Sequence, residues 1–131
     1  MSGYILDDLA LAAGLANAGS EHHRRELSRL FHGAVDGGPT LDLPALCLTT
    51  ATLARPAVAD HVADIVAAAP PGAVTISGLI RTAHLDALLS WAPALGWPAT
   101  HAAVRAMATG LPVLTVAPDR YAKAGIDVLT L

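Results

Sequence analysis

The stretch Tyr4-Ile5-Leu6-Asp7-Asp8-Leu9-Ala10-Leu11 decides how the chain begins to fold. Its first three residues form a short apolar run, which predicts a buried strand. Asp7 follows at the point where a strand should pass into a helix. Apolar residues then recur at helical spacing at Leu9, Ala12 and Ala13, and we expect this helix to end around Asn17 to Gly19. A strand followed directly by a helix indicates an α/β protein.

The rest of the chain repeats this alternation. Further strands are predicted at residues 41–43, 73–76, 112–116 and 126–129. The predicted helices run from the Ser20 N-cap to Gly37, from Pro44 to about Leu53, from Pro56 to Ala69, from a Ser77 cap to Trp91, from the Gly96-Trp97-Pro98 turn to Gly110, and from Pro118 to Ala122. Pro93, together with that turn, is expected to separate the two helices around it. Strands separated by helices imply a parallel sheet with helices on both faces.

Composition narrows the functional classes. Residues 1–131 suit a single domain without repeats or linkers, and 53% of them are hydrophobic against 15% charged. So apolar a chain is not intrinsically disordered, and its net charge of -3 disfavours a strongly basic nucleic-acid binder. The one cysteine, Cys47, rules out an internal disulfide or a cysteine zinc cage, and its apolar surroundings favour a buried thiol.

Neither a secretory leader nor an apolar run long enough to cross a membrane is visible. We therefore expect a soluble, cytoplasmic protein that makes no membrane contact.

Three local signatures, in this order and spacing, resemble the PIN-domain family, in particular its small VapC-like toxins. The first is the opening strand, aspartate and helix just quoted. The second is Leu43-Pro44-Ala45-Leu46-Cys47-Leu48, a strand followed by a proline that begins a helix. The third runs from His101-Ala102-Ala103 through Gly110-Leu111-Pro112-Val113-Leu114-Thr115 to Pro118 and Tyr121. Together they span nearly the whole chain.

The resemblance implies a three-layer α/β/α fold around a central, mostly parallel five-stranded sheet. It also implies Mg²⁺- or Mn²⁺-dependent cleavage of RNA, with three or four carboxylates at the carboxyl ends of the strands holding the metal. A homodimer and an antitoxin or other protein partner would be expected as well.

This sequence departs from the family at most of the metal-ligand positions. Asp7 matches the first carboxylate, but the other three positions fall on or near Thr50, Ala99 and Ala117, none of which is acidic. Asp119 lies two residues beyond the last of them. A weak metal site and catalytic centre could combine Asp7 with Asp119, because the two strands that these acids follow should be neighbours in the family's sheet. The other possibility is that Asp7 combines with a displaced acid such as Asp86.

Each of these residues also has a purely structural interpretation, which we favour. Asp7 is expected to cap the helix that follows it, and Asp8 to lie on the surface or stabilise the first helical turn. Asp119 suits the start of a short helix, and His101 has no acid near it in sequence, which favours a packed histidine over a catalytic base.

The only basic concentration is the stretch from His22 to His32, which contains Arg24, Arg25 and Arg29. These arginines are candidates for contacts with RNA phosphates. No aromatic residues interleave to stack bases, so we favour a solvated helix face in which Glu21 pairs with Arg25. Trp91 and Trp97 are either core residues or the edge of an apolar patch for a partner.

Three functions remain open. We favour a PIN-like protein that is catalytically impaired and acts as a binding or oligomerisation module, with no cofactor. The alternative is a weakly active ribonuclease toxin that uses Mg²⁺ or Mn²⁺. The third is an RNA-binding protein without catalysis.

Overall fold

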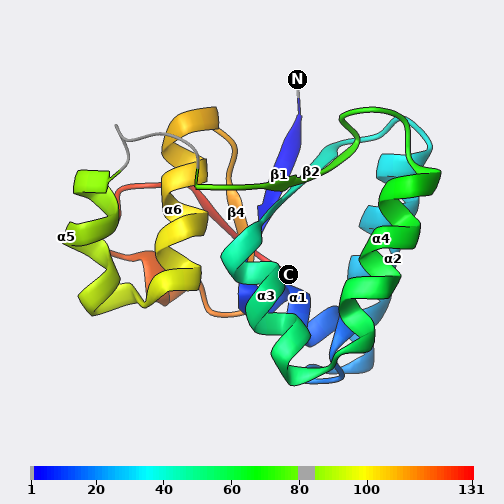
Figure 1. Ribbon diagram of the computed structural model, residues 1–131, viewed down its shortest axis with the longest axis horizontal. Helices are drawn as coiled ribbons and strands as arrows, with labels where there is room; N and C mark the ends of the chain where they lie inside the picture. The colour runs from blue at the N-terminus through cyan, green and yellow to red at the C-terminus, as the bar shows by residue number, and fades with distance from the viewer. Residues whose placement is uncertain (1, 80–84) are drawn as a thin grey trace.

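The structure is a computed structural model that describes residues 2–79 and 85–131. Its centre is a five-stranded sheet in the order β3-β2-β1-β4-β5, and every neighbouring pair is parallel (Figure 1). The strands are β1 (Gly3–Leu6), β2 (Thr40–Pro44), β3 (Val74–Ser77), β4 (Val113–Thr115) and β5 (Val128–Thr130). The predicted α/β fold with a five-stranded sheet is confirmed, and the sheet is parallel throughout.

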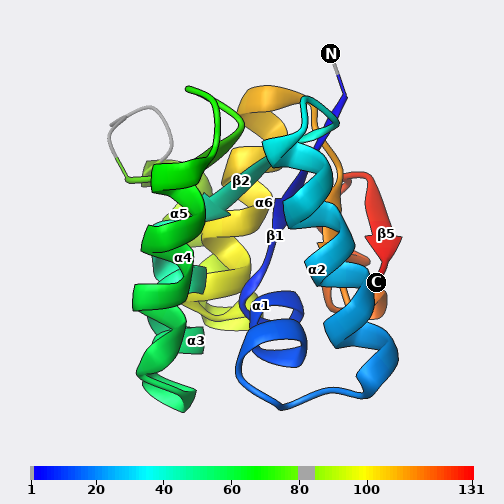
Figure 2. The same ribbon diagram turned by 90° about the vertical axis from the view of Figure 1, so that its right-hand side faces the viewer.

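Six helices accompany the sheet: α1 (Asp8–Leu15), α2 (Glu21–Val35), α3 (Ala45–Ala54), α4 (Ala57–Ala68), α5 (Leu85–Leu95) and α6 (Trp97–Thr109). Helices α5 and α6 lie on one side of the sheet, and α2 and α4 lie on the other (Figures 1 and 2). Helices α1 and α3 pack together near the carboxyl ends of β1 and β2. A 3-10 turn, η2 (Pro118–Tyr121), follows β4. The predicted order of elements is therefore confirmed.

Alternation along the strands explains how the sheet is covered. Leu41 and Leu43 are fully buried on one face of β2, whereas Asp42 between them points to the opposite face, toward α6. Ile5 of β1 is paired with Asp42 on one side and with Val113 on the other. The core thus lies on both faces of the sheet, which is why the strand sequences are almost continuously apolar.

Helix boundaries follow the capping residues in several places. Ser20 caps α2 as predicted, because its hydroxyl accepts a hydrogen bond from the His23 backbone and the His23 ring accepts one in return. Gly110 ends α6 with φ 75°, a left-handed conformation that favours glycine.

Three predicted boundaries are wrong. Ser77 is the last residue of β3 rather than a helix cap, and its hydroxyl donates to Asp42 at 2.6 Å. The start predicted for the helix after it lies partly in residues 80–84, outside the described part of the chain. Pro93 does not end α5, which continues through it to Leu95. The last strand begins at Val128, two residues later than predicted, so Asp127 precedes it.

Among the described residues, no helix is both long enough and apolar enough to span a membrane.

Candidate functional site

Asp7 lies where the strand order places a site. It follows β1, whose neighbours β2 and β4 lie on opposite sides, so the chain changes direction across the sheet at this point. The Asp7 side chain is completely buried, and its Oδ1 accepts the Ala10 backbone N–H at 2.8 Å. This is the predicted N-cap of α1.

The second oxygen of Asp7 is held from the other end of the chain. Its Oδ2 accepts the hydroxyl proton of Tyr121 at 2.6 Å, and Nη1 of Arg120 lies 3.5 Å away. Protein donors therefore face both oxygens of the Asp7 carboxylate.

Asp8 is drawn into the same cluster. Nη1 of Arg120 donates to its Oδ1 at 2.7 Å and Nη2 to its Oδ2 at 3.3 Å, a forked pairing. Asp8 does lie in the first turn of α1, as expected, but it is 7% exposed. The expectation of a surface position is wrong because the guanidinium covers this carboxylate.

The 3-10 turn η2 carries both partners of the aspartates. Residue Thr115 ends β4, and its hydroxyl oxygen accepts the Ala117 backbone N–H at 3.2 Å, which turns the chain back over the sheet. Tyr121 is almost fully buried, and the Arg120 guanidinium lies 5.9 Å from the centre of its ring. The turn thereby fixes one cation and one hydroxyl donor above Asp7 and Asp8.

Burial dominates the electrostatics of this cluster. It raises the pKa of Asp7 above its usual value, and hydrogen bonds from Tyr121, Thr115 and Ala10 offset part of that rise. Burial and the Asp7 charge raise the pKa of Tyr121, which therefore stays protonated and keeps donating. Burial opposes the charge on Arg120, but the Asp8 carboxylate outweighs it and raises the pKa of Arg120. The cluster is thus one cation and one neutral hydroxyl against two carboxyl groups.

The other predicted positions contribute no acidic ligand. Asp119 is exposed on η2 and shares neither a hydrogen bond nor an ion pair with Asp7. The Thr50 hydroxyl donates to the Leu46 carbonyl of its own helix at 2.8 Å. Ala99 is buried in α6, and Ala117 is a partly buried residue before η2. Asp86, the other displaced acid considered, is exposed in the first turn of α5.

The residues present do not fit a Mg²⁺ or Mn²⁺ ion. Such an ion needs free carboxylate oxygens and room for water in an octahedral arrangement. Here one aspartate is fully buried with both oxygens engaged, and the other is forked onto a guanidinium. Within residues 2–79 and 85–131, no three His, Cys, Asp or Glu side chains form a group that could hold a metal ion.

A second buried charge pair lies under α6. Arg105 donates to Asp42 Oδ2 through Nε and also approaches it through Nη2, each at 2.9 Å, while Ser77 donates to Oδ1. The sequence alone did not predict this pair. Its signal was an acid in the middle of an apolar strand, since such a residue must find a partner across the layer.

His101 is packed, as predicted. It is fully buried in α6, and its Nδ1 accepts the Leu46 backbone N–H at 3.3 Å. Burial lowers its pKa, while the Gly78 backbone and Asp42 act in the opposite direction. A neutral imidazole that accepts at Nδ1 ties α6 to the start of α3.

The three arginines of α2 form local contacts. Arg25 pairs with Glu21 at 3.3 Å, which confirms the predicted pair, and Arg29 pairs with Glu26 at 2.5 Å. Arg24 donates to the Gly19 carbonyl at 3.3 Å. All three are exposed, and two are balanced by glutamates.

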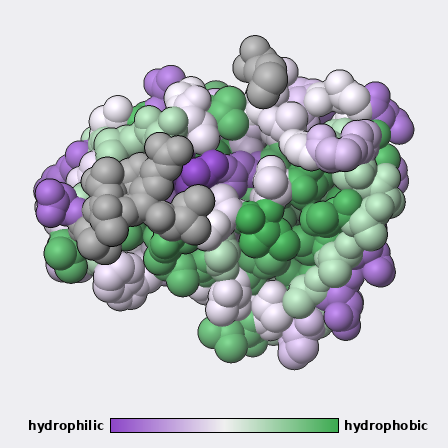
Figure 3. Space-filling model, turned by 45° about the horizontal axis from the view of Figure 1, so that its top comes forward, coloured by the Kyte–Doolittle hydropathy of each residue, from purple (hydrophilic) through white to green (hydrophobic). Residues whose placement is uncertain are grey.

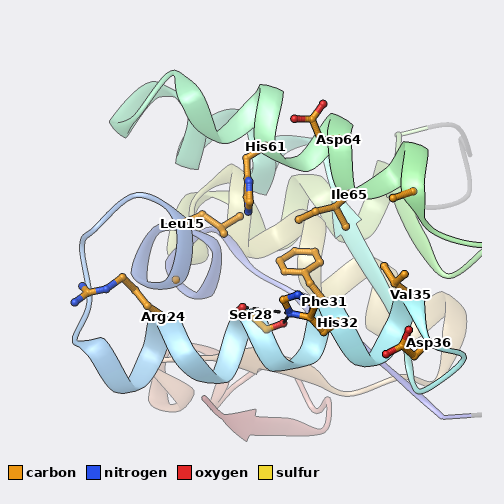
Figure 4. Close-up of a pocket in the computed structure, with 12 residues that line it drawn as sticks. Leu15, Arg24, Ser28, Phe31, His32, Val35, Asp36, His61, Asp64 and Ile65 are labelled. Atoms are coloured by element: carbon orange, nitrogen blue, oxygen red, sulfur yellow. Dashed lines mark hydrogen bonds between the residues drawn. The ribbon is translucent and has the colours of Figure 1, made fainter.

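An apolar groove of about 450 Å³ separates α2 from α4 (Figure 4). Phe31 of α2 and Ile65 of α4 point toward each other and form the apolar floor of the groove, and Leu15 lies at one end of it. The His61 side chain of α4 points into the groove, opposite Ser28 and His32 of α2, whose side chains are hydrogen-bonded to each other. Apolar surface gathers on this side of the molecule in Figure 3 (right-hand part). None of the predicted metal ligands lines this groove.

Cys47 and the two tryptophans complete the predicted residues. Cys47 is a free, buried thiol that donates to the Pro98 carbonyl at 3.0 Å, and burial raises its pKa. Trp91 packs against the core, whereas Trp97 is 52% exposed beside Leu89. Trp91 therefore fits the interpretation as a core residue, and Trp97 fits the interpretation as the edge of an exposed apolar patch.

Arg120 is the main residue of the site that the sequence did not indicate. Arg120 lies 112 residues from Asp8 in the sequence. The only sequence signal for a role in the site was its position in the short segment after the predicted strand 112–116, next to Pro118-Asp119. No protein-family model and no curated protein matches this chain.

Proposed function

We propose that this chain is a PIN-like protein without metal-dependent nuclease chemistry, which acts by binding a protein partner. One observation carries the proposal: the Asp7 carboxylate has protein donors on both oxygens, and its neighbour Asp8 is forked onto Arg120. The PIN resemblance rests on the motifs and supports the family assignment, while the cluster supports the loss of chemistry.

The chemistry of phosphodiester cleavage explains why such a cluster is inert. Metal-dependent nucleases need an ion to activate a water and to stabilise charge on the phosphate. A guanidinium fixed between two carboxylates cannot lower the pKa of a bound water in that way. With Arg120 in place, the two aspartates stabilise the folded chain rather than a transition state.

The groove between α2 and α4 supports the binding half of the proposal. Its apolar floor and polar rim are typical of surfaces that bind another molecule, and the charge-poor composition adds to that expectation. We favour a protein partner, either a second copy of this chain or a different chain, because Arg25 and Arg29 pair with glutamates and Arg24 donates to a backbone carbonyl.

An RNA-cleavage assay tests the loss of chemistry. Purified wild-type protein and Asp7→Asn are incubated with a mixed-sequence single-stranded RNA in Mg²⁺, in Mn²⁺ and in EDTA. We expect no difference among the six reactions. Cleavage that requires the metal and disappears in Asp7→Asn would contradict the proposal and establish the alternative, a weakly active ribonuclease toxin.

A further inference from the structure

One nitrogen of Arg120 stands between two carboxylates. Nη1 lies 2.7 Å from Asp8 Oδ1 and 3.5 Å from Asp7 Oδ2, so a single NH₂ group bridges consecutive acidic residues at the end of β1. A bridging position between carboxylate oxygens is also the kind of place that a divalent cation takes.

We propose that Arg120 is the resident cation of this site and takes the place of a divalent metal ion. This inference rests on the proposed function, but it assigns the loss of the metal to one residue of this chain. It adds to the missing carboxylates a second and independent cause, which can be reversed by substitution.

The fold holds the guanidinium firmly in that position. The Arg120 side chain is 21% exposed and lies over the ring of Tyr121, whose hydroxyl is bonded to Asp7. Arginine, with its fork of donors, is the side chain best suited to a buried pair of carboxylates. Removing one partner of such a pair leaves an uncompensated charge, which is strongly unfavourable.

Loss of the Arg120 guanidinium therefore leaves a negative charge at the site that another cation would neutralise. Among the described residues, Arg120 supplies all the side-chain hydrogen bonds that Asp8 receives. Without it, Asp8 presents two free oxygens, and Asp7 Oδ2 keeps the Tyr121 hydroxyl on one lone pair while its other lone pair faces the vacated volume. An ion with water ligands in that volume would then bridge the two carboxylates.

Thermal unfolding with and without MnCl₂ tests the inference. In Arg120→Gln we expect a melting temperature below that of wild type, which Mn²⁺ raises by several degrees, since an ion bound only by the folded state stabilises it. Wild type and Arg120→Lys, which keeps the positive charge, should show no such rise. Adding Asp7→Asn to Arg120→Gln should abolish it.

Arg105→Gln is the matched control. It removes a guanidinium from the other buried carboxylate, Asp42, and in the described part of the chain Arg105 bridges no second carboxylate to it. We expect it to be destabilised without any response to Mn²⁺. A rise equal to that of Arg120→Gln would show a general effect of the metal and overturn the inference.

Two further results would also overturn it: an Asp7-dependent rise in wild type, or no rise in Arg120→Gln. Should Arg120→Gln be unfolded, Mn²⁺ is expected to restore its circular-dichroism spectrum, and failure to do so counts equally against the inference. The RNA assay separates the two proposals. Wild type that is inert on RNA, with an Arg120→Gln that ignores Mn²⁺, defeats only the inference, whereas Asp7-dependent cleavage defeats the proposed function.

Discussion

The Tyr121 hydroxyl, near the C-terminal end of the sequence, donates a hydrogen bond to Asp7 Oδ2, near the N-terminal end. A hydrogen bond to a buried charged group contributes more to stability than one between neutral groups, because loss of the donor leaves the charge unsatisfied. Tyr121→Phe removes only this donor and keeps the ring in the core. We expect it to lower the free energy of unfolding by about 1.5–3 kcal/mol, measured by urea denaturation.

Tyr4→Phe provides the control for that substitution. Tyr4 is half-buried, and its hydroxyl makes no hydrogen bond to any described residue. A change below about 0.5 kcal/mol is expected there. Equal effects at Tyr4 and Tyr121 would mean that the bond to Asp7 has no special role.

His101 makes stability depend on pH. Because burial lowers its pKa, the unfolded chain binds a proton at this residue below pH about 6.5 that the folded protein does not bind. The contribution of His101 to stability is therefore complete above that pH and is lost as the pH falls toward its folded pKa. His101→Gln should flatten the dependence of unfolding free energy on pH between 7 and 5, and an unchanged slope would contradict this role.

Individual site residues were only partly predictable from the sequence. The Asp7 cap could be predicted because strand, acid and helix are adjacent in the chain. The burial of Asp8 could not, since its partner Arg120 comes from the opposite end. Asp42 and Arg105 were missed for the same reason: each is an ordinary charged residue until β2 and α6 are packed together.

At the scale of elements, close contact between α1 and α2 depends on Gly14. A Cβ atom built there would lie 2.2 Å from Leu27 Cδ2 and 2.7 Å from Leu27 Cβ. Gly14→Ala should therefore destabilise the protein by about 1–3 kcal/mol through overpacking, despite the higher helix propensity of alanine.

Gly33→Ala, in the last turn of α2, gives the opposite expectation. Among the described residues, nothing outside the backbone of α2 itself lies within 4 Å of a Cβ built at that position, so only helix propensity changes. We expect a gain of about 0.5–1 kcal/mol in the same chemical denaturation experiment. If both substitutions destabilised the protein equally, the loss at Gly14 could not be attributed to a clash between α1 and Leu27 of α2.

Elements were predicted well in number and order and less well at their ends. Apolar runs and prolines indicate where strands and helices alternate, because these signals are local. Ser77 has the chemistry of a helix cap, but its hydroxyl is taken by Asp42 across the sheet. Pro93 is a usual signal for the end of a helix because it lacks a backbone N–H, yet α5 continues two residues beyond it to Leu95.

At the scale of the whole molecule, the groove between α2 and α4 provides a test of association. Our proposal of a protein partner includes a second copy of this chain, and we expect the wild type to sediment as a dimer at micromolar concentrations. Ala68 is exposed and lines the groove, whereas Ala67 is exposed on the same helix and does not. Ala68→Arg should favour the monomer and Ala67→Arg should not. Identical sedimentation of the two variants would argue against this groove as the interface.

The parallel sheet was predictable because strands separated by helices have few other arrangements. The proposed loss of metal-dependent chemistry could be argued from the sequence, because Thr50, Ala99 and Ala117 carry no acid. The proposal that Arg120 takes the place of a metal ion could not, because it depends on the packing of η2 over α1.

Binding of Mn²⁺ to the wild-type protein decides between an internally neutralised site and a metal centre. The free aqueous ion is counted by electron paramagnetic resonance while Mn²⁺ is titrated into protein at neutral pH. We predict that the free ion equals the ion added, in wild type and in Asp7→Asn alike. One equivalent of Mn²⁺ bound by the wild type and lost in Asp7→Asn would show that Arg120 does not close the site.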